Sequence, residues 1–238
     1  MKHYRIASLR VAMKTFGRTE EQARIYEIPV ETEPDFTIAS NTEKMLTENH
    51  HMTADECEYI SSGESFYTQI LAHKGMMLHA SCVVVDNKAY LFSAPSGTGK
   101  STHTELWLKL FPNQAYILND DKPALRFEDG VWYAYGTPWS GKNDINRNTR
   151  IPVAGIAFLE RSKENSIELL SGSNAITEIL NQTLRPLHPF YRVCVLENLN
   201  NLISMVPIWK LKCNTDLSAA MVSYRAMAGV NKENQNET

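Results

Sequence analysis

A glycine-rich stretch between two segments of different character constrains this chain more than any other feature. Residues 93–102 read Ser-Ala-Pro-Ser-Gly-Thr-Gly-Lys-Ser-Thr. An apolar, strand-like run at 89–92 precedes the stretch, and a helix-like run at 104–110 follows it. This order of strand, glycine loop and helix is the context that a phosphate-binding P-loop requires. The pattern therefore predicts a site for a nucleoside triphosphate, and the alternative is a chance glycine-rich turn.

The residues of the loop have the chemistry that phosphates require. Two glycines allow the backbone to bend so that successive amide N–H groups point into one concavity, and the following helix N-terminus adds unpaired donors and partial positive charge. Lys100 is expected to reach the β- and γ-phosphates, and Ser101 offers a hydroxyl to Mg²⁺. The pattern G-x-x-x-x-G-K-[ST] has glycine where this chain has Ala94. The predicted nucleotide-binding residues are Ser96, Gly97, Thr98, Gly99, Lys100, Ser101 and Thr102.

Length, charge and cysteine spacing exclude several classes of protein. The 238 residues suffice for one large domain, or for a core domain with a satellite. A formal net charge of -3 argues against a general nucleic-acid binder. Because no apolar run approaches the length of a membrane span and the N-terminus is too broken for a signal sequence, we expect a cytoplasmic protein without membrane partners. The four cysteines form no C-x-x-C pair, so we expect free thiols rather than a zinc site.

Three regions follow one another along the chain. Residues 1–75 predict a strand-rich extension with strands near 4–13, 24–30 and 35–38. The sequence Thr-Ala-Asp-Glu at 53–56 is a capping-box pattern and predicts a helix within 53–74. Ser-Ser-Gly at 61–63 interrupts its apolar stripe, so the alternative is a helix over the later part alone. Residues 76–228 predict the P-loop domain, and the polar segment 229–238 is expected to be a disordered tail.

The P-loop domain alternates strands and helices in an order that predicts a mixed sheet. Strands are expected at 78–85 and 89–93, at 114–118, in a hairpin over 124–135, at 153–159 and at 208–212. Helices are expected at 174–184, 189–203 and 217–226. Because hairpins flank the loop–helix unit, the predicted fold class is α/β with a mixed sheet, in contrast to the parallel sheet of a doubly wound fold.

An acid pair and a histidine are the candidate partners of the P-loop. Asp120 and Asp121 follow an apolar strand, where P-loop proteins need an acid for Mg²⁺ or its waters. Two adjacent acids permit two roles, one toward the metal and one as acceptor of a proton from an incoming hydroxyl. His79 begins the strand before the loop and is a further candidate. The alternatives are a solvated turn for the acids and a core or surface position for the histidine.

A loop over 136–143 and two arginines after it are weaker candidates. Lys142 is a candidate contact for a phosphate or an acidic substrate, and Trp139 for the wall of a pocket. Arg147 and Arg150 lie on the polar run that follows and are candidate phosphate or substrate contacts. The alternative for all four is an ordinary surface loop.

The order of His79, the loop at 96–101 and the acid pair resembles the catalytic domain of HPr serine kinase/phosphorylase, over roughly residues 77–228. The same P-loop class includes ATP-dependent phosphoenolpyruvate carboxykinases and kinases that modify peptide precursors. The resemblance implies that residues 97–102 bind the phosphates of ATP and that Ser101 and Asp120 serve Mg²⁺. It implies that Asp121 is the general base toward a serine hydroxyl, with His79 and Lys100 as its active-site partners, and that the chain self-associates.

The chain departs from that family in three places. Residues up to about 75 do not resemble its N-terminal domain, Gly-Thr-Pro-Trp-Ser-Gly-Lys at 136–142 stands where the family has an acidic, glycine-containing signature, and Lys-Cys-Asn-Thr-Asp at 212–216 replaces an arginine–glycine stretch. These departures argue against the phosphorylase reaction and against HPr itself as the substrate.

We therefore expect a Mg²⁺-ATP-dependent kinase that phosphorylates a hydroxyl on a protein, a peptide or a small molecule. The alternatives are a non-catalytic ATP-binding regulatory or accessory module, a nucleotide hydrolase and a carboxykinase. The carboxykinase alternative is the weakest, because the chain is short for that enzyme and lacks a matching set of metal-binding lysine and histidine residues.

Overall fold

Strands β6 (Ala80–Val85) and β7 (Lys88–Ser93) form a buried hairpin of the core sheet in the computed structural model, which describes residues 1–30 and 33–233. Asp86 and Asn87 join them with φ angles of 51° and 54°, the left-handed pair that a two-residue hairpin turn favours. Because side chains alternate along a strand, Cys82 packs on one face of the sheet and Val83 on the other. Both faces are therefore buried, as the nearly continuous apolar sequence predicts.

The remaining strands complete a mixed sheet in the order β5-β9-β10-β11-β7-β6-β8, with β13 beside β11 and β12 beside β13. Strand β11 pairs in parallel with β7 and β13 and antiparallel with β10, which confirms the predicted mixed α/β architecture. The strands are β5 (Gly75–Met77), β8 (Tyr116–Asn119), β9 (Ala124–Glu128), β10 (Val131–Tyr135), β11 (Arg150–Arg161), β12 (Ser166–Leu169) and β13 (Ile208–Cys213).

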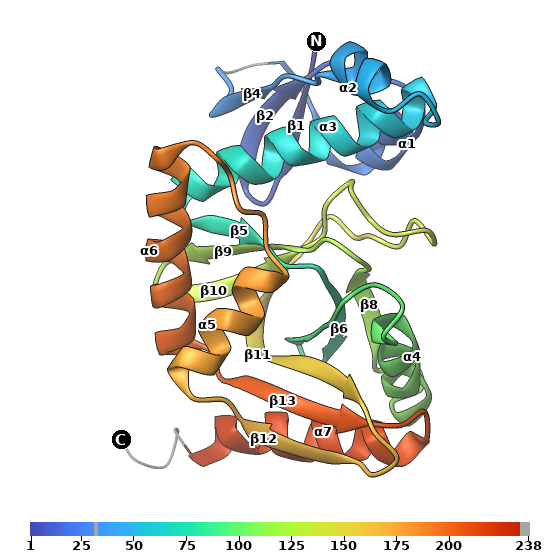
Figure 1. Ribbon diagram of the computed structural model, residues 1–238, viewed down its shortest axis with the longest axis vertical. Coiled ribbons are helices and arrows are strands. Elements are labelled where there is room, and N and C mark those ends of the chain that lie inside the picture. The colour runs from blue at the N-terminus through green and yellow to red at the C-terminus, as the bar shows by residue number, and fades with distance from the viewer. Residues whose placement is uncertain (31–32, 234–238) are drawn as a thin grey trace.

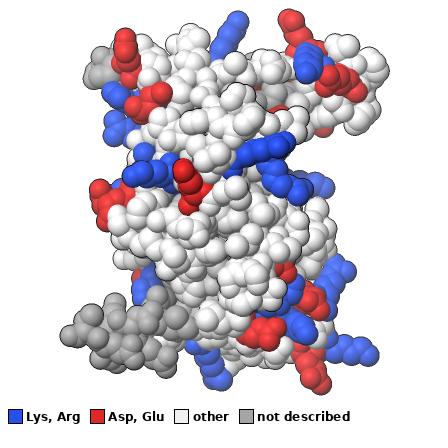
Figure 2. Space-filling model, turned by 60° about the vertical axis from the view of Figure 1, so that its left-hand side comes forward, with Lys and Arg blue, Asp and Glu red and all other residues white. Residues whose placement is uncertain are grey.

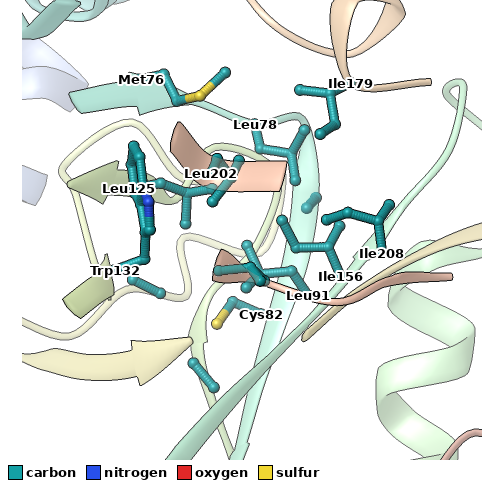
Figure 3. Packing of buried hydrophobic residues seen from close by; sticks show 14 of the residues in the cluster. Met76, Leu78, Cys82, Leu91, Leu125, Trp132, Ile156, Ile179, Leu202 and Ile208 are labelled. Carbon is teal, nitrogen blue, oxygen red and sulfur yellow. The ribbon is translucent and has the colours of Figure 1, made fainter. Parts of the chain in front are cut away.

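Two pairs of helices cover the two faces of this sheet (Figure 1). Helices α5 (Gly172–Asn181) and α6 (Pro189–Met205) pack on one face, and α4 (Lys100–Leu110) and α7 (Leu217–Glu233) on the other. Figure 3 shows the first of these cores, with Met76, Leu78, Cys82, Leu91, Leu125, Trp132, Ile156, Ile179, Leu202 and Ile208. Helix α7 runs on past residue 228, where we expected a tail to begin, and residues 234–238 of that tail lie outside the described residues.

The N-terminal unit has its own sheet, in the order β3-β1-β2-β4. Its elements are β1 (Lys2–Ile6), β2 (Leu9–Met13), α1 (Gly17–Ala23), η1 (Arg24–Tyr26), β3 (Glu27–Ile28), β4 (Phe36–Ile38), α2 (Thr42–Glu48), α3 (Ala54–Gln69) and η2 (Ile70–His73). The expected strand over 4–13 is a hairpin, because Ala7 and Ser8 adopt positive φ angles of 51° and 63° without the glycine or asparagine that signals such a turn. Helices α1 and α2 lie in a stretch for which the sequence predicted strands and loops, and of the strand predicted at 24–30 only β3 forms, after the short helix η1.

Helix α3 lies between the N-terminal sheet and the core (Figure 1). The predicted capping box is confirmed, because the Thr53 side chain accepts a hydrogen bond from Glu56 N and the Glu56 carboxylate accepts one from Thr53 N. The helix runs unbroken through the small residues at 61–63, where its apolar stripe is interrupted. An added Cβ at Gly63 would lie 2.9 Å from the Trp139 ring, so the small residues bring the helix close to this indole, which also stacks on Phe66 at 4.8 Å.

Figure 2 shows the side of the molecule on which α6 lies. Charged side chains gather toward the two ends of this face and in a band across its middle, and uncharged surface lies between them. Phe190, Val193 and Leu196 of α6 are each more than half exposed, at 54%, 54% and 58%.

Within the described ranges, no helix combines the length and the apolar character needed to cross a lipid bilayer.

Candidate functional site

The predicted phosphate-binding loop connects β7 to the first residue of α4. Gly97 and Gly99 have φ angles of 78° and 124°, and an added Cβ at either position would meet nothing within 4 Å. Glycine is therefore needed here for its backbone conformation and not for lack of space. Gly99 is the N-cap of α4 and accepts a hydrogen bond from His103 N, so the unpaired amides of the helix N-terminus open toward the loop.

Lys100 places its ammonium group inside the loop. Its side chain is buried, and Nζ donates a 3.0 Å hydrogen bond to the carbonyl oxygen of Ala94. Burial lowers the pKa of Lys100, and the nearby carboxylates Asp121 and Asp120 oppose this shift. The lysine thus lies within the electrostatic reach of both acids, with the carbonyl of Ala94 as its hydrogen-bond partner.

Asp120 and Ser101 face each other across the mouth of the loop. The Ser101 hydroxyl lies 3.3 Å from each carboxylate oxygen of Asp120. Both backbone groups of Asp120 are hydrogen-bonded: its N–H donates to Ile145 O, and its carbonyl oxygen accepts from Gly141 N, each at 3.0 Å. The segment that follows β10 therefore fixes the position of the acid.

The donor set of Ser101 and Asp120 fits Mg²⁺. A hydroxyl and a carboxylate are hard oxygen ligands, and this ion takes one or two protein oxygens together with phosphate oxygens and waters. Among residues 1–30 and 33–233, no three or more His, Cys, Asp or Glu side chains gather to hold a metal by themselves. Such a cation would therefore depend on the nucleotide for part of its coordination.

Asp121 and His79 form the second half of the site. His79 Nε2 lies 3.0 Å from Asp121 Oδ1, and His79 Nδ1 lies 3.0 Å from Gln182 Oε1. Lys122 Nζ lies 2.9 Å from Asp121 Oδ2. Burial raises the pKa of Asp121, but the hydrogen bond from His79 and the charge of Lys122 outweigh it and leave that pKa well below its usual range. Asp121 is therefore held as an oriented carboxylate.

The backbone at Asp121 has a φ angle of +78°. Residues other than glycine seldom adopt this conformation, although aspartate tolerates it better than most. Strain of this kind persists where the surrounding structure enforces it, and it is common at functional sites. Here the Asp121 carbonyl accepts a 3.1 Å hydrogen bond from Ala80 N, which ties the strained residue to the segment that carries His79.

Three residues of the site were not among the sequence-based candidates. Lys122 adjoins the acid pair and could have been found from that position. Gln182 and Arg161 could not, because each lies far along the chain from the residue that it contacts. The guanidinium group of Arg161 donates to the carbonyl oxygens of Thr98, at 3.1 Å, and of Gly97, and it thereby braces the loop from its outer side.

The other candidates occupy different surroundings. Arg147 lies over the Tyr116 ring at 4.7 Å, and Arg150 pairs with Glu128 at 2.6 Å. Both guanidinium groups are thus engaged away from the loop, and their role as substrate contacts stays a prediction. Lys142 is exposed on the segment next to Asp120. Trp139 is buried and not on a surface turn, and it also forms part of a cavity wall.

A cavity of about 340 Å³ adjoins the outer side of the loop. Its walls include Gly97, Thr98, Thr102, His103, Arg161 and Asn214. The cavity therefore extends from the start of α4 to the C-terminal ends of β11 and β13.

Comparisons with known proteins give no family. No protein-family model matches the chain, and no curated protein matches its sequence. Among solved structures, the chain is similar to the Hpr(Ser) kinase/phosphatase from Coxiella burnetii, with 15% sequence identity and a TM-score of 0.38 over 66% of this chain and 98% of that one. This degree of similarity assigns neither family nor activity, so the proposal for function depends on the geometry of the site.

Proposed function

We propose that this protein is a Mg²⁺-ATP-dependent phosphotransferase that transfers the γ-phosphoryl group to a hydroxyl. The observation that supports this most directly is that two aspartates with different hydrogen-bond and ion-pair partners lie beside one P-loop. Asp120 faces the Ser101 hydroxyl at 3.3 Å, whereas Asp121 is oriented by His79 at 3.0 Å and Lys122 at 2.9 Å. A module that only bound nucleotide would need the first acid and not the second.

Each group has a role in the transfer step. The loop amides and the Lys100 ammonium neutralise negative charge on the β- and γ-phosphates. Bound at Ser101 and Asp120, Mg²⁺ would supply further charge neutralisation at the phosphates. The cavity beside the loop has room for the remainder of the nucleotide.

Asp121 acts on the acceptor. Its carboxylate accepts a hydrogen bond from the hydroxyl and takes the proton as the hydroxyl oxygen forms its bond to the γ-phosphorus. The bond from that phosphorus to the β–γ bridging oxygen breaks, and ADP leaves with the electron pair. A carboxylate of low pKa suits a loose transition state, in which orientation of the acceptor matters more than early removal of its proton.

Labelled ATP tests the proposal. Calorimetry should show Mg²⁺-dependent binding of ATP to the wild type, and γ-³²P-ATP should label serine-containing peptides. Asp121→Asn should retain ATP affinity and lose transfer by about a hundredfold or more, in the range for general-base groups. Asp129→Asn is the matched control, because Asp129 also has a positive φ, of 49°, but lies in the exposed β9–β10 turn.

The other outcomes assign the alternatives. Binding of ATP with neither transfer nor phosphate release would indicate a non-catalytic module. Phosphate release without an acceptor, lost in Lys100→Ala, would indicate a hydrolase. Failure of the wild type to bind ATP at all would overturn the proposal.

A further inference from the structure

A cavity of about 220 Å³ lies where the N-terminal unit meets the core. Helix α3 supplies one wall, and strand β5, the segment after β10 and the segment after α5 supply the others. The walls include Tyr59, Ile60, Tyr67, Met77, Trp139 and Leu184. These side chains are aromatic or aliphatic, so the interior of the cavity is mostly carbon.

The polar atoms of the aromatic walls already have partners within the protein. The Tyr59 hydroxyl donates to Ser140 O, and the Tyr67 hydroxyl donates to Lys122 O. Trp139 Nε1 donates to the hydroxyl of a serine in α3 at 3.0 Å. Apart from Lys122 and the exposed Glu64, the walls therefore present ring faces and methyl groups, which favour apolar groups.

One residue connects this cavity to the proposed catalytic base. Lys122 lines the cavity, and its ammonium group lies 2.9 Å from Asp121 Oδ2 and 6.0 Å from the centre of the Tyr59 ring. Lys122 thus borders the cavity and also contacts Asp121. The cavity beside the P-loop has a different lining, with no residue common to both among the described parts of the chain.

We infer that this cavity holds an apolar side group of the phosphoacceptor, aromatic or branched aliphatic, attached within a few bonds of the accepting hydroxyl. The inference rests on the proposed function, which places the accepting hydroxyl at Asp121. Binding of the apolar group positions that hydroxyl, and residues outside the P-loop domain thereby select the substrate. Helix α3 of the N-terminal unit supplies much of this wall.

The test compares acceptors that differ only in the apolar group. Acetyl-Ala-Phe-Ser-Ala-amide and acetyl-Ala-Ala-Ser-Ala-amide form the peptide arm, and phenylpropanol and propanol form the small-alcohol arm. Burial of a phenyl group should raise kcat/KM by about ten- to a hundredfold in at least one arm. The arm that responds identifies whether the acceptor is a peptide or a small alcohol. Equal rates within both arms would overturn the inference and leave the kinase proposal intact.

Ile60→Asp probes the cavity itself, because Ile60 is 46% exposed at its edge and a charge there opposes apolar binding. This variant should lose the preference for the phenyl acceptor and keep its ATP affinity. Ile25→Asp is the matched control, since Ile25 is 56% exposed in the same N-terminal unit but does not line the cavity. Ile60→Trp, which fills the opening without a charge, should have the same effect as Ile60→Asp. A preference that survives both Ile60 variants would place the apolar group elsewhere and overturn the inference.

A measurement without nucleotide separates this inference from the proposed function. Saturation-transfer NMR should detect the phenyl group of the peptide or alcohol on the wild type and on Ile25→Asp, and lose it on Ile60→Asp. If ATP fails to bind but this pattern holds, the phosphotransferase proposal fails and the cavity remains a site for an apolar group. If ATP binds and is turned over but the phenyl probes show no contact, the inference is wrong.

Discussion

The ion pair between Lys122 and Asp121 gives a prediction whose size follows from the structure. An opposite charge at this distance typically lowers a carboxyl pKa by about one to three units. The two side chains are 36% and 28% exposed, so solvent screens the pair and the low end of that range applies. Lys122→Met should therefore raise the pKa of Asp121 by about one unit, equivalent to about 1.4 kcal/mol, while His79 continues to hold it down.

The sign of the effect on stability follows from the same shift. Because the pKa of Asp121 in the folded protein lies below its ordinary value of 3.8, the ionised group stabilises the fold above that pH. This stabilisation is lost as the pH falls through the folded-state pKa. Lys122→Met should remove about 1.4 kcal/mol of this stabilisation at neutral pH, so the variant should unfold at a higher pH than the wild type on acidification.

Two measurements check this prediction. Carbon-13 NMR of the aspartate carboxyl groups gives the titration midpoint directly, and circular dichroism follows acid unfolding. Lys109→Met is the control, because this substitution also removes one positive charge and Lys109 is exposed on α4. An unchanged midpoint for Asp121 in Lys122→Met, or an equal change in Lys109→Met, would refute the assignment of the shift to this pair.

Four further changes test other parts of the structure. Lys100→Ala should weaken ATP binding by about 1.5–3 kcal/mol, the value of a charge-assisted hydrogen bond; calorimetry that shows unchanged affinity would contradict the placement of its ammonium. Ser101→Ala combined with Asp120→Asn should abolish the difference in ATP affinity between Mg²⁺ and EDTA, and persistence of that difference would place the cation elsewhere. Trp139→Ala should cost about 3–5 kcal/mol in urea unfolding, and a loss below about 1 kcal/mol would show a loosely packed junction between α3 and the core. Burial raises the pKa of Glu58 to about 7 from 4.5, so the stability that its protonated form provides is lost as the pH rises through 7. Glu58→Gln should therefore be a few kcal/mol more stable than the wild type at pH 8 and similar to it near pH 4. Parallel curves of stability against pH for the two proteins would contradict this.

The sequence predicts the strands and turns of the core better than those of the N-terminal unit, because the signals in the core are local sequence patterns. The hairpin of β6 and β7 combines a nearly continuous apolar sequence with an Asp-Asn turn, and the loop that follows has two glycines at positive φ. Each of these signals lies within a few residues of the structure that it specifies. The turn at Ala7 and Ser8 has no such signal, because its conformation depends on pairing between β1 and β2 and on hydrogen bonds to Arg126 and Tyr135 of the core sheet.

The candidate site likewise contains residues that the sequence identifies and residues that it does not. The loop and the acid pair are local motifs, and the sequence identifies them together with His79. Gln182, which contacts His79 across 103 positions, and Arg161, which contacts the loop across 63 and 64, become neighbours only when the sheet and its helices assemble. Polar residues of this kind are common on surfaces, so composition and spacing do not distinguish them.

The brace from Arg161 to the carbonyls of Gly97 and Thr98 has a kinetic consequence. A segment that already has its bound shape loses little conformational entropy when an anion arrives. Encounter with ATP should then be limited by diffusion and not by ordering of the backbone. If the loop binds a triphosphate as proposed, the guanidinium would also add positive potential from behind the peptide planes without occupying the loop amides itself.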